Sequence, residues 1–286
     1  MEKFIIASGT ALRISDSGYG RTAAGKNPEG SKPTIVLLHG YLESLDVWDD
    51  FTKLLAPRLR VVSLDLPGHG VSEVKGEVHT MDFLADVVRG VLEEQGIGKC
   101  VLAGHSMGGY AALAFLRKYP EMLDGFILFH SFPGADIPEK IEHRQREIEV
   151  VLSGKKDLLA NTVAMGFAAH NRAKFVNAIA DLSEQVVLTE EEGVVALLRG
   201  MSERADSNDM LRKSDVPQMF VLGRHDEYIT MPIAEDMVAR HPQAEVLWLE
   251  DSGHMGFIEE PQKSAEAIID FCQRVSGIAF EPAVKE

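Results

Sequence analysis

Ser106 is the residue of this sequence best placed to act as a nucleophile. It lies in the pattern Gly-x-Ser-x-Gly, between Gly104 and Gly108. An apolar run at 100–103 precedes the pattern, and a helix-forming run at 111–116 follows it. In a strand–turn–helix context this pattern raises a serine hydroxyl above the end of a sheet, and the strained turn leaves no room for bulky neighbours. The pattern therefore predicts a nucleophilic serine on a tight turn, called a nucleophile elbow.

A serine hydroxyl is a weak nucleophile at neutral pH, so it needs a base, and the base needs an acid that orients it. Two later apolar runs end in residues of these types. The run at 219–222 leads into Asp226, and the run at 245–249 leads into His254, which follows Gly253. Ser, Asp, His is one of the known chain orders of a catalytic triad. Two alternatives stay open here: Glu227 as the acid, and His254 as an ordinary loop histidine.

The elements that position these residues follow from the hydrophobic pattern. Continuous apolar runs indicate strands that are buried on both faces, and apolar residues at helical spacing indicate amphipathic helices. Two short strands are expected first, at 4–7 and 11–17. Further strands are expected at 34–38, 60–64, 99–103 and 125–129, with helices at 44–55, 80–95 and 106–119 between them. This alternation predicts an α/β fold with an open, doubly wound, mostly parallel sheet and ligands bound beyond the carboxyl ends of its strands.

The alternation stops between 133 and 214, where no convincing strand is found. Helices are expected there instead, at 137–152, 158–165, 172–182 and 189–205. Strands return at 216–222 and 245–249, and helices are expected at 232–240 and 261–275. We therefore expect a helical cap at 133–214, inserted in a core domain formed by 1–132 and 215–286. The Gly-rich stretch at 18–33 is interpreted as a mobile surface loop, and 277–286 as a loose tail.

The composition argues against several kinds of partner. The 286 residues suit one large α/β domain, with or without an inserted lobe. The formal charge of −15 disfavours nucleic acid as a partner. No apolar run approaches the roughly 20 residues of a membrane span, and the run after Lys3 is too short for a signal peptide, so a cytoplasmic protein is expected. No metal or cofactor is expected, because no ligand spacing links Cys100 with Cys272 or the histidines at 39, 69, 105 and 130.

Over about residues 4–275, the chain resembles the α/β-hydrolase superfamily. The similarity is to its capped, single-domain branch, which includes esterases, cofactor-free perhydrolase-like enzymes and C–C bond hydrolases. Five segments carry the resemblance, in the order of that branch: His39-Gly40, Asp65-Leu66-Pro67-Gly68-His69-Gly70-Val71-Ser72, the elbow at 104–108, the acid segment at 223–226 and the base segment Gly253-His254. In the second segment, Asp65 and Ser72 are interpreted as turn residues without chemistry.

The resemblance implies a role for each residue of the site. Ser106 would attack the substrate, His254 would take its proton and later deliver one to the leaving group, and Asp226 would orient His254. The backbone N–H groups of Tyr41 and Met107 would form the oxyanion hole. A serine in place of an aspartate at the elbow argues against dehalogenase and epoxide hydrolase chemistry.

The resemblance thus implies cleavage of a small carboxylic ester or related acyl compound through an acyl-enzyme, as in carboxylesterases, with a small-molecule substrate as the partner. C–C bond hydrolysis and small acyl-thioester hydrolysis remain as alternatives on the same triad. A non-catalytic small-molecule receptor is the alternative from another class, although a pure binder has no need of three catalytic groups.

Further residues are candidates for the substrate pocket, and packing within the core is the competing interpretation. These candidates are His39, Gly40, His130, Ser131, Met165, Phe167, Phe175 and Met255. Four basic residues of the insertion are suited either to an acidic substrate or to solvated helix faces, namely Arg144, Arg146, Arg172 and Lys174.

Overall fold

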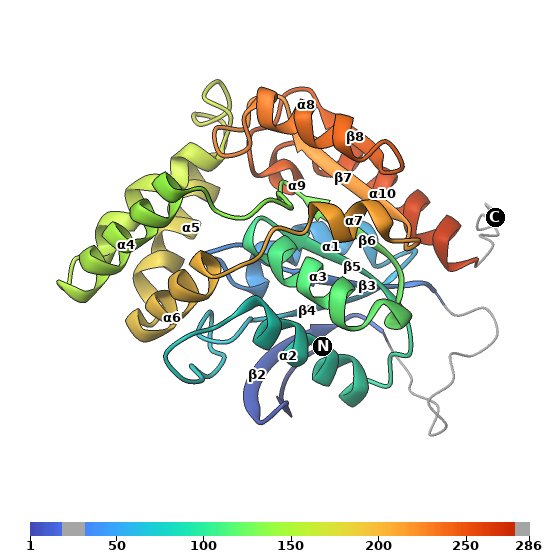
Figure 1. The fold of residues 1–286 in the computed structure, drawn as a ribbon, viewed down its shortest axis with the longest axis horizontal. Helices are drawn as coiled ribbons and strands as arrows, with labels where there is room; N and C mark the ends of the chain where they lie inside the picture. Colours follow the sequence, from blue (N-terminus) through green and yellow to red (C-terminus); the bar gives the residue numbers. More distant parts are fainter. Residues whose placement is uncertain (19–31, 278–286) are drawn as a thin grey trace.

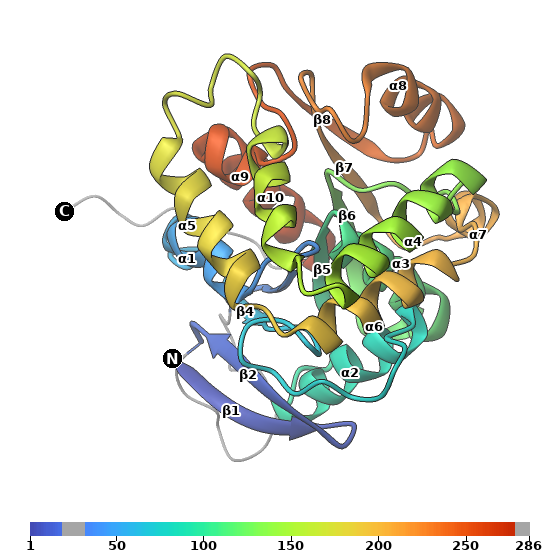
Figure 2. The same ribbon diagram turned by 90° about the vertical axis from the view of Figure 1, so that its left-hand side faces the viewer.

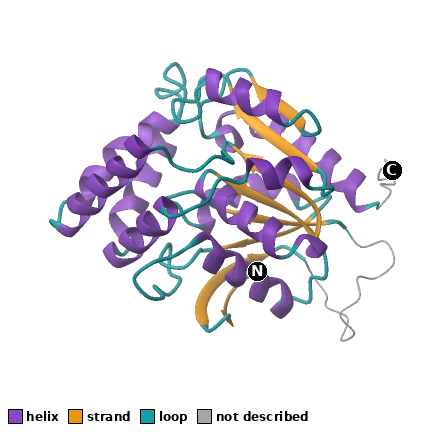
Figure 3. Ribbon diagram, viewed as in Figure 1, coloured by secondary structure: helices purple, strands orange, loops and turns teal. Residues whose placement is uncertain are grey.

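A computed structural model describes residues 1–18 and 32–277 of the chain. One eight-stranded sheet lies at its centre, with helices on both faces (Figure 1, Figure 3). The strands are β1 (Glu2–Ala7), β2 (Thr10–Asp16), β3 (Thr34–Leu38), β4 (Arg60–Leu64), β5 (Cys100–His105), β6 (Leu123–Phe129), β7 (Gln218–Gly223) and β8 (Glu245–Leu249). The expected surface loop at 18–33 lies almost wholly outside the described residues, and so does the expected tail, apart from Gly277.

The strand order in the sheet is β1-β2-β4-β3-β5-β6-β7-β8. The hairpin of β1 and β2 is antiparallel and pairs antiparallel with β4, whereas the remaining neighbours are all parallel. Figure 2 shows the hairpin at one end of the sheet and β8 at the other. Every residue of β3 and of β5 is buried, as expected for central strands covered on both faces. The predicted doubly wound, mostly parallel α/β sheet is confirmed.

Two hydrophobic clusters fill the two sides of this sheet. Because successive side chains of a strand point to opposite faces, Val36 and Leu38 belong to one cluster, and Ile35 and Leu37 belong to the other. The first cluster includes residues of α2 (Met81–Glu94), α3 (Met107–Lys118) and α8 (Met231–Arg240). The second includes residues of α1 (Asp49–Leu55) and α10 (Pro261–Ser276). The sheet is therefore the middle layer of three.

The segment between β6 and β7 is helical, as predicted. It contains α4 (Pro138–Leu152), the 3₁₀ segment η3 (Lys156–Gly166), α5 (Val176–Leu188), α6 (Glu191–Ser202) and α7 (Asn208–Lys213). Three contacts hold it over the loops that follow the strands. Gln185 donates to Ser44 after β3, the Cα of Gly193 lies against Gly68 after β4, and the Gly166 carbonyl accepts from the N–H of His254 after β8. The insertion thus covers the carboxyl edge of the sheet. The division of the chain into a core domain and a cap domain stays a prediction.

The structure differs from the expected elements in short segments. The helix expected at 158–165 is a 3₁₀ segment, and the helix expected at 172–182 begins only at Val176. Four short elements, namely η1 (Leu45–Trp48), η2 (Pro120–Met122), α7 and α9 (Gly256–Glu259), were not predicted as separate elements, because three to six residues carry too little periodicity. Among the described residues, no helix has the length and apolar character needed to span a membrane.

Candidate functional site

Ser106 lies on the tight turn between β5 and α3, where the sequence predicts it. Its φ of 49° and ψ of −112° are sterically unfavourable for a residue with a side chain. The Ser106 N–H donates to the carbonyl of Phe129 (3.0 Å), and its own carbonyl accepts the Ser131 hydroxyl (2.7 Å). A Cβ on Gly104 would lie 2.3 Å from the carbonyl carbon of Gly108. The turn therefore has its observed shape only because this position is glycine.

His254 and Asp226 meet as the sequence predicts. Nδ1 of His254 lies 2.7 Å from Oδ2 of Asp226. The other carboxylate oxygen accepts the backbone N–H groups of Tyr228 (2.8 Å) and Ile229 (2.9 Å). Burial by itself would raise the pKa of Asp226, but the facing imidazoles of His254 and His130 keep it well below its usual range. Asp226 is therefore a carboxylate, Nδ1 of His254 carries a hydrogen, and Nε2 is left as a base.

The alternative acid, Glu227, lies elsewhere. Its carboxylate is partly exposed and forms an ion pair with Arg172 at 2.6 Å. Adjacent residues of a loop point in different directions, so only one of the two carboxylates reaches the imidazole. The geometry therefore favours Asp226 over Glu227 as the partner of His254.

His105 joins the loop that carries His254 to the elbow. Its Nε2 lies 2.9 Å from the carbonyl oxygen of His254, and its Nδ1 lies 3.0 Å from Oε2 of Glu43. The same Oε2 accepts the N–H of Gly40 at 2.6 Å. Burial disfavours the charged forms of both groups, yet each stabilises the other, so the pKa of His105 is raised and the pKa of Glu43 is lowered. This buried ion pair connects the loops that follow β3, β5 and β8.

The Ser106 hydroxyl makes no hydrogen bond to His254 in the described part of the chain. The link between the two segments runs through His105, the neighbour of Ser106, which bonds to the His254 carbonyl and whose ring is tilted against that of His254, with centroids 4.9 Å apart. Catalytic hydrogen bonds often shorten only when substrate binds. A Ser106–His254 proton transfer therefore stays a prediction.

The two N–H groups expected to form the oxyanion hole have no partner among residues 1–18 and 32–277. Met107 is the first residue of α3, where an N–H has no acceptor within the helix. The N–H of Tyr41 lies in the loop after β3. The start of α3 packs against that loop so closely that a Cβ on Gly108 would lie 2.4 Å from the Leu38 carbonyl oxygen and 2.7 Å from that of His39. Both free N–H groups thus come from segments in direct contact.

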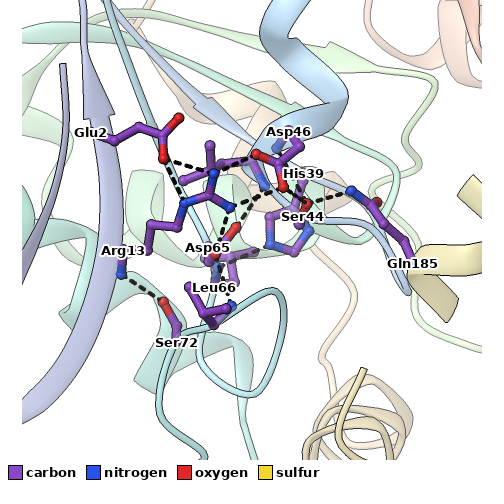
Figure 4. Close-up of polar contacts among 11 residues, drawn as sticks. Glu2, Arg13, His39, Ser44, Asp46, Asp65, Leu66, Ser72 and Gln185 are labelled. Carbon is purple, nitrogen blue, oxygen red and sulfur yellow. Dashed lines mark hydrogen bonds and ion pairs between the residues drawn. The ribbon is translucent and has the colours of Figure 1, made fainter. Parts of the chain in front are cut away.

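A polar network supports the loop that carries Tyr41 (Figure 4). The fully buried carboxylate of Asp65 accepts two backbone N–H groups, at 2.7 and 3.0 Å, which agrees with its interpretation as a turn residue. Arg13 forms an ion pair with Asp46 at 2.6 Å, and Gln185 of the insertion donates to the Ser44 hydroxyl at 2.7 Å. The sequence analysis did not single out Arg13, Gln185 or Glu43. Their partners are distant in the chain, up to 141 residues for Gln185, so no local pattern marks them.

The candidate pocket residues occupy different environments. Both ring nitrogens of His39 are engaged, Nδ1 with the Gly40 carbonyl (2.7 Å) and Nε2 with the N–H of Leu66 (2.9 Å). Phe167 and Met255 belong to one buried cluster, and the Phe175 ring packs 5.8 Å from that of Phe167. Met165 is 43% exposed. Gly40, Ser131 and His130 contact Glu43, the Ser106 carbonyl and Asp226, respectively. The contact of these eight residues with substrate stays a prediction.

The four basic residues of the insertion all have partners. Arg144 pairs with Asp136, Arg146 with Glu142 (2.9 Å) and Arg172 with Glu227, while Lys174 lies over the Phe175 ring at 4.7 Å. This arrangement favours their interpretation as structural or surface residues over a clamp for an acidic substrate.

One group of side chains has the spacing of metal ligands. Atoms of His130, Asp226 and His254 lie within 4.8 Å of one another. A metal ion needs lone pairs, but both nitrogens that face the carboxylate carry hydrogens. For His254 this follows from its hydrogen bond to Asp226, and for His130 it follows because Nε2 already accepts the N–H of Gly256 (3.1 Å). The three side chains therefore form a polar cluster whose hydrogen-bearing nitrogens do not suit a cation.

Comparisons of the sequence and the structure show which proteins the chain is similar to. A sequence model described as "Alpha/beta hydrolase family" matches residues 35–267. The structure superimposes on a thermophilic esterase from Thermogutta terrifontis with a TM-score of 0.86 and 29% identity, covering 96% of this chain and 99% of the other. The chain is 29% identical over 256 residues to a pimeloyl-[acyl-carrier protein] methyl ester esterase of Aeromonas hydrophila, covering 85% of this chain and 96% of the relative.

A third relative has a different activity. It is a 2-hydroxy-6-oxononadienedioate/2-hydroxy-6-oxononatrienedioate hydrolase of Paraburkholderia phymatum. The two chains are 26% identical over 285 residues, and the match covers 93% of each. The expected resemblance to the esterase and C–C hydrolase branches is confirmed. Because the family match spans well over half of its length, the chain belongs to the alpha/beta hydrolase family and is, by class, a hydrolase.

Proposed function

We propose that the protein is a serine hydrolase that cleaves a small carboxylic ester or a related acyl compound. Ser106 Oγ attacks the acyl carbon while His254 Nε2 takes its proton, and the alcohol then leaves with that proton. Water, deprotonated by the same imidazole, hydrolyses the acyl-enzyme and frees Ser106. Asp226 holds His254 with Nε2 unprotonated, and the N–H groups of Tyr41 and Met107 stabilise the negative oxygen of each tetrahedral intermediate.

The observation that carries this proposal is the 2.7 Å hydrogen bond between Nδ1 of His254 and Oδ2 of Asp226, made by an imidazole whose loop is bonded to the elbow through His105. This is the arrangement that a general base for a neighbouring hydroxyl requires. A receptor that only binds a small molecule gains nothing from a buried carboxylate aligned on an imidazole. The esterase relatives support the choice of an ester as substrate.

The test is replacement of the nucleophile. Ser106→Ala should abolish hydrolysis of p-nitrophenyl acetate and labelling by a fluorophosphonate probe, because no other hydroxyl replaces Oγ on the strained turn. Ser153→Ala, which removes an exposed hydroxyl that donates to the nearby Val150 carbonyl, is the matched control and should keep both. Unchanged ester hydrolysis in the Ser106→Ala protein would refute the proposal. A wild-type protein that is folded but takes no label would favour the receptor alternative.

A second candidate is C–C bond hydrolysis, which rests on the relative from Paraburkholderia phymatum, similar over 93% of both chains. The assay compares ester, thioester and diketone-type substrates on the wild type and on His254→Ala. Faster turnover of the diketone than of any ester would replace the ester proposal by the C–C one, and a preference for the thioester would select the third candidate on the same triad.

The remaining proposals concern partners and location. We propose a small molecule as the partner. Nucleic acid is not proposed because of the net charge of −15, and a membrane is not proposed because no apolar run approaches the roughly 20 residues of a span. A cytoplasmic location is proposed because no apolar run of the sequence approaches the roughly 20 residues of a membrane span. Cell fractionation of the native host, with an antibody to the protein, tests it directly.

A further inference from the structure

We propose that His130 is a positioning residue of the site, whose Nδ1–H faces the Asp226 carboxylate and thereby reduces the stabilisation that this carboxylate gives to a protonated His254. This inference rests on the proposed function, because it assigns a use to the acid and base of that mechanism. His130 follows β6 and is fully buried.

The position of His130 is unusual for the backbone as well as for the side chain. Its φ is 45°, in the left-handed region that few residues with a side chain adopt. Its N–H donates to the Val221 carbonyl (2.9 Å), and its ring stacks on Phe129 at 5.2 Å. A strained backbone that aims a buried polar ring at Asp226 indicates a constraint beyond packing, since an apolar side chain would fill the same space without an unpaired polar atom.

The hydrogen-bond partners of the ring determine where its proton lies. Nε2 accepts the N–H of Gly256 at 3.1 Å, so Nε2 carries no hydrogen. Burial lowers the pKa of His130 to about 4, so the ring is neutral at physiological pH. A neutral imidazole with a bare Nε2 has its hydrogen on Nδ1. This N–H lies 3.3 Å from Oδ2 of Asp226. It makes no aligned hydrogen bond in this conformation, and the carboxylate is the acceptor that it faces.

His130 and His254 face the same carboxylate oxygen of Asp226. Oδ2 of Asp226 faces Nδ1 of His254 at 2.7 Å and Nδ1 of His130 at 3.3 Å. Each N–H that approaches the oxygen stabilises its negative charge, so the carboxylate gains less from a protonated His254 and stabilises it less. His130 therefore favours the unprotonated, active form of the base. Without this donor, the acidic limb of the kcat/KM–pH profile moves to higher pH.

Substitution of His130 leaves the other ionisable groups around Asp226 and His254 in place. They are His105 with its partner Glu43 beneath the ring, Tyr228 beside it with ring centroids 4.9 Å apart, and Glu227, which is paired with Arg172.

Two amide variants distinguish the role of Nδ1 of His130 from that of Nε2. In His130→Asn, the side-chain N–H₂ stands near the place of Nδ1, and asparagine tolerates a positive φ. In His130→Gln, the amide reaches the place of Nε2 and retains the contact with Gly256, but the donor to Asp226 is lost. His130→Phe removes both and keeps the stacking on Phe129. His241→Asn, another buried histidine, hydrogen-bonded to Asn208 on the far side of β7, is the matched control.

The experiment measures kcat/KM for an activated ester between pH 4.5 and 9 in folded variants, with circular dichroism as the check on folding. We expect the acidic limb to rise by about 0.5–1 pH unit in His130→Gln and His130→Phe, which lowers kcat/KM about three- to tenfold below the limb and changes it little on the plateau. His130→Asn should keep most of the wild-type limb, and His241→Asn all of it. A purely structural role predicts the opposite order, with Gln better than Asn, and this order would overturn the proposal.

A second measurement does not depend on activity. In protein labelled with ¹⁵N-histidine, long-range correlations to the ring carbons' protons report which ring nitrogen carries hydrogen, and the His130→Asn spectrum assigns the signal. We expect a neutral His130 with hydrogen on Nδ1 from pH 6 to 8. Hydrogen on Nε2, or an imidazolium at pH 7, would overturn the proposal. If Ser106 of the wild type takes no fluorophosphonate, the proposed function fails, and the tautomer still decides the contact between His130 and Asp226.

Discussion

Replacing Glu43 by glutamine tests the buried ion pair beneath the elbow. Oε2 of Glu43 accepts both the N–H of Gly40 (2.6 Å) and Nδ1 of His105 (3.0 Å). A hydrogen bond to a charged group contributes about 1.5–3 kcal/mol. Glutamine keeps one oxygen that can accept both N–H groups, but without the negative charge each bond falls to the roughly 0.5–1.5 kcal/mol of a neutral pair. His105 relieves part of the loss by giving up its proton. We therefore expect the free energy of unfolding to fall by about 2–3 kcal/mol near pH 6, and Tm to fall by about 5–10 °C.

The pH dependence gives this prediction its sign. The pKa of His105 is raised above its usual 6.5, so its contribution to stability is complete below pH 6.5 and is lost as the pH rises through the folded value. The pKa of Glu43 is lowered below its usual 4.5, so its contribution is complete above pH 4.5 and is lost as the pH falls through the folded value. The difference in the free energy of unfolding between wild type and variant should be largest between pH 4.5 and pH 6.5 and smaller at pH 9.

The assay is thermal or urea unfolding of both proteins at pH 5.5 and pH 9, with kcat/KM for an activated ester measured in parallel. Activity should also fall, because Gly40 precedes the N–H of Tyr41 that is proposed for the oxyanion hole. Glu93→Gln, which breaks an exposed pair with Arg89, is the control and should leave Tm unchanged. An equal loss of stability at both pH values, or a loss no greater than that of the control, would refute the reasoning.

The remaining predictions concern the acid and the elbow. Asp226→Asn should lower kcat by about 10⁴-fold, because an amide no longer selects the tautomer of His254, whereas Glu227→Gln should stay near wild type, since that carboxylate faces Arg172; equal losses in the two variants would contradict the assignment. Gly108→Ala should prevent accumulation of folded protein or lower Tm sharply, because its Cβ would lie 2.4 Å from the Leu38 carbonyl oxygen; Gly98→Ala, where nothing lies within 4 Å of the added Cβ, is the control in a far-UV circular dichroism melt. A wild-type Tm for Gly108→Ala would show that the elbow and the loop after β3 separate more easily than their contact implies.

Much of the fold could be predicted from the sequence because its signals are local. Short β-branched runs such as 34–38 favour strands buried on both faces, and their alternation with helical patterns leaves a parallel sheet as the simple topology. Thr80 caps α2 by accepting the N–H of Phe83, as its position before an amphipathic run indicates. The short elements escaped prediction. The turn before α5 is held by Glu259, which accepts the N–H of Ala168 (2.9 Å) from 91 residues away, and no pattern within the turn records that contact.

The sequence by itself determined the elbow, since Gly104, Ser106 and Gly108 must adopt one strained turn, and it determined the types and order of the two residues that we propose complete a triad. The tertiary structure decided which of two adjacent carboxylates faces His254, because Asp226 and Glu227 are chemically alike and differ only in the direction in which the loop after β7 turns them. It also decided that His130 and His254 share one carboxylate oxygen and that His105 bonds to a residue 149 positions away. Such contacts depend on how the ends of four parallel strands are brought to one edge of the sheet. The spacing of these residues along the chain does not predict how far apart their side chains lie in space.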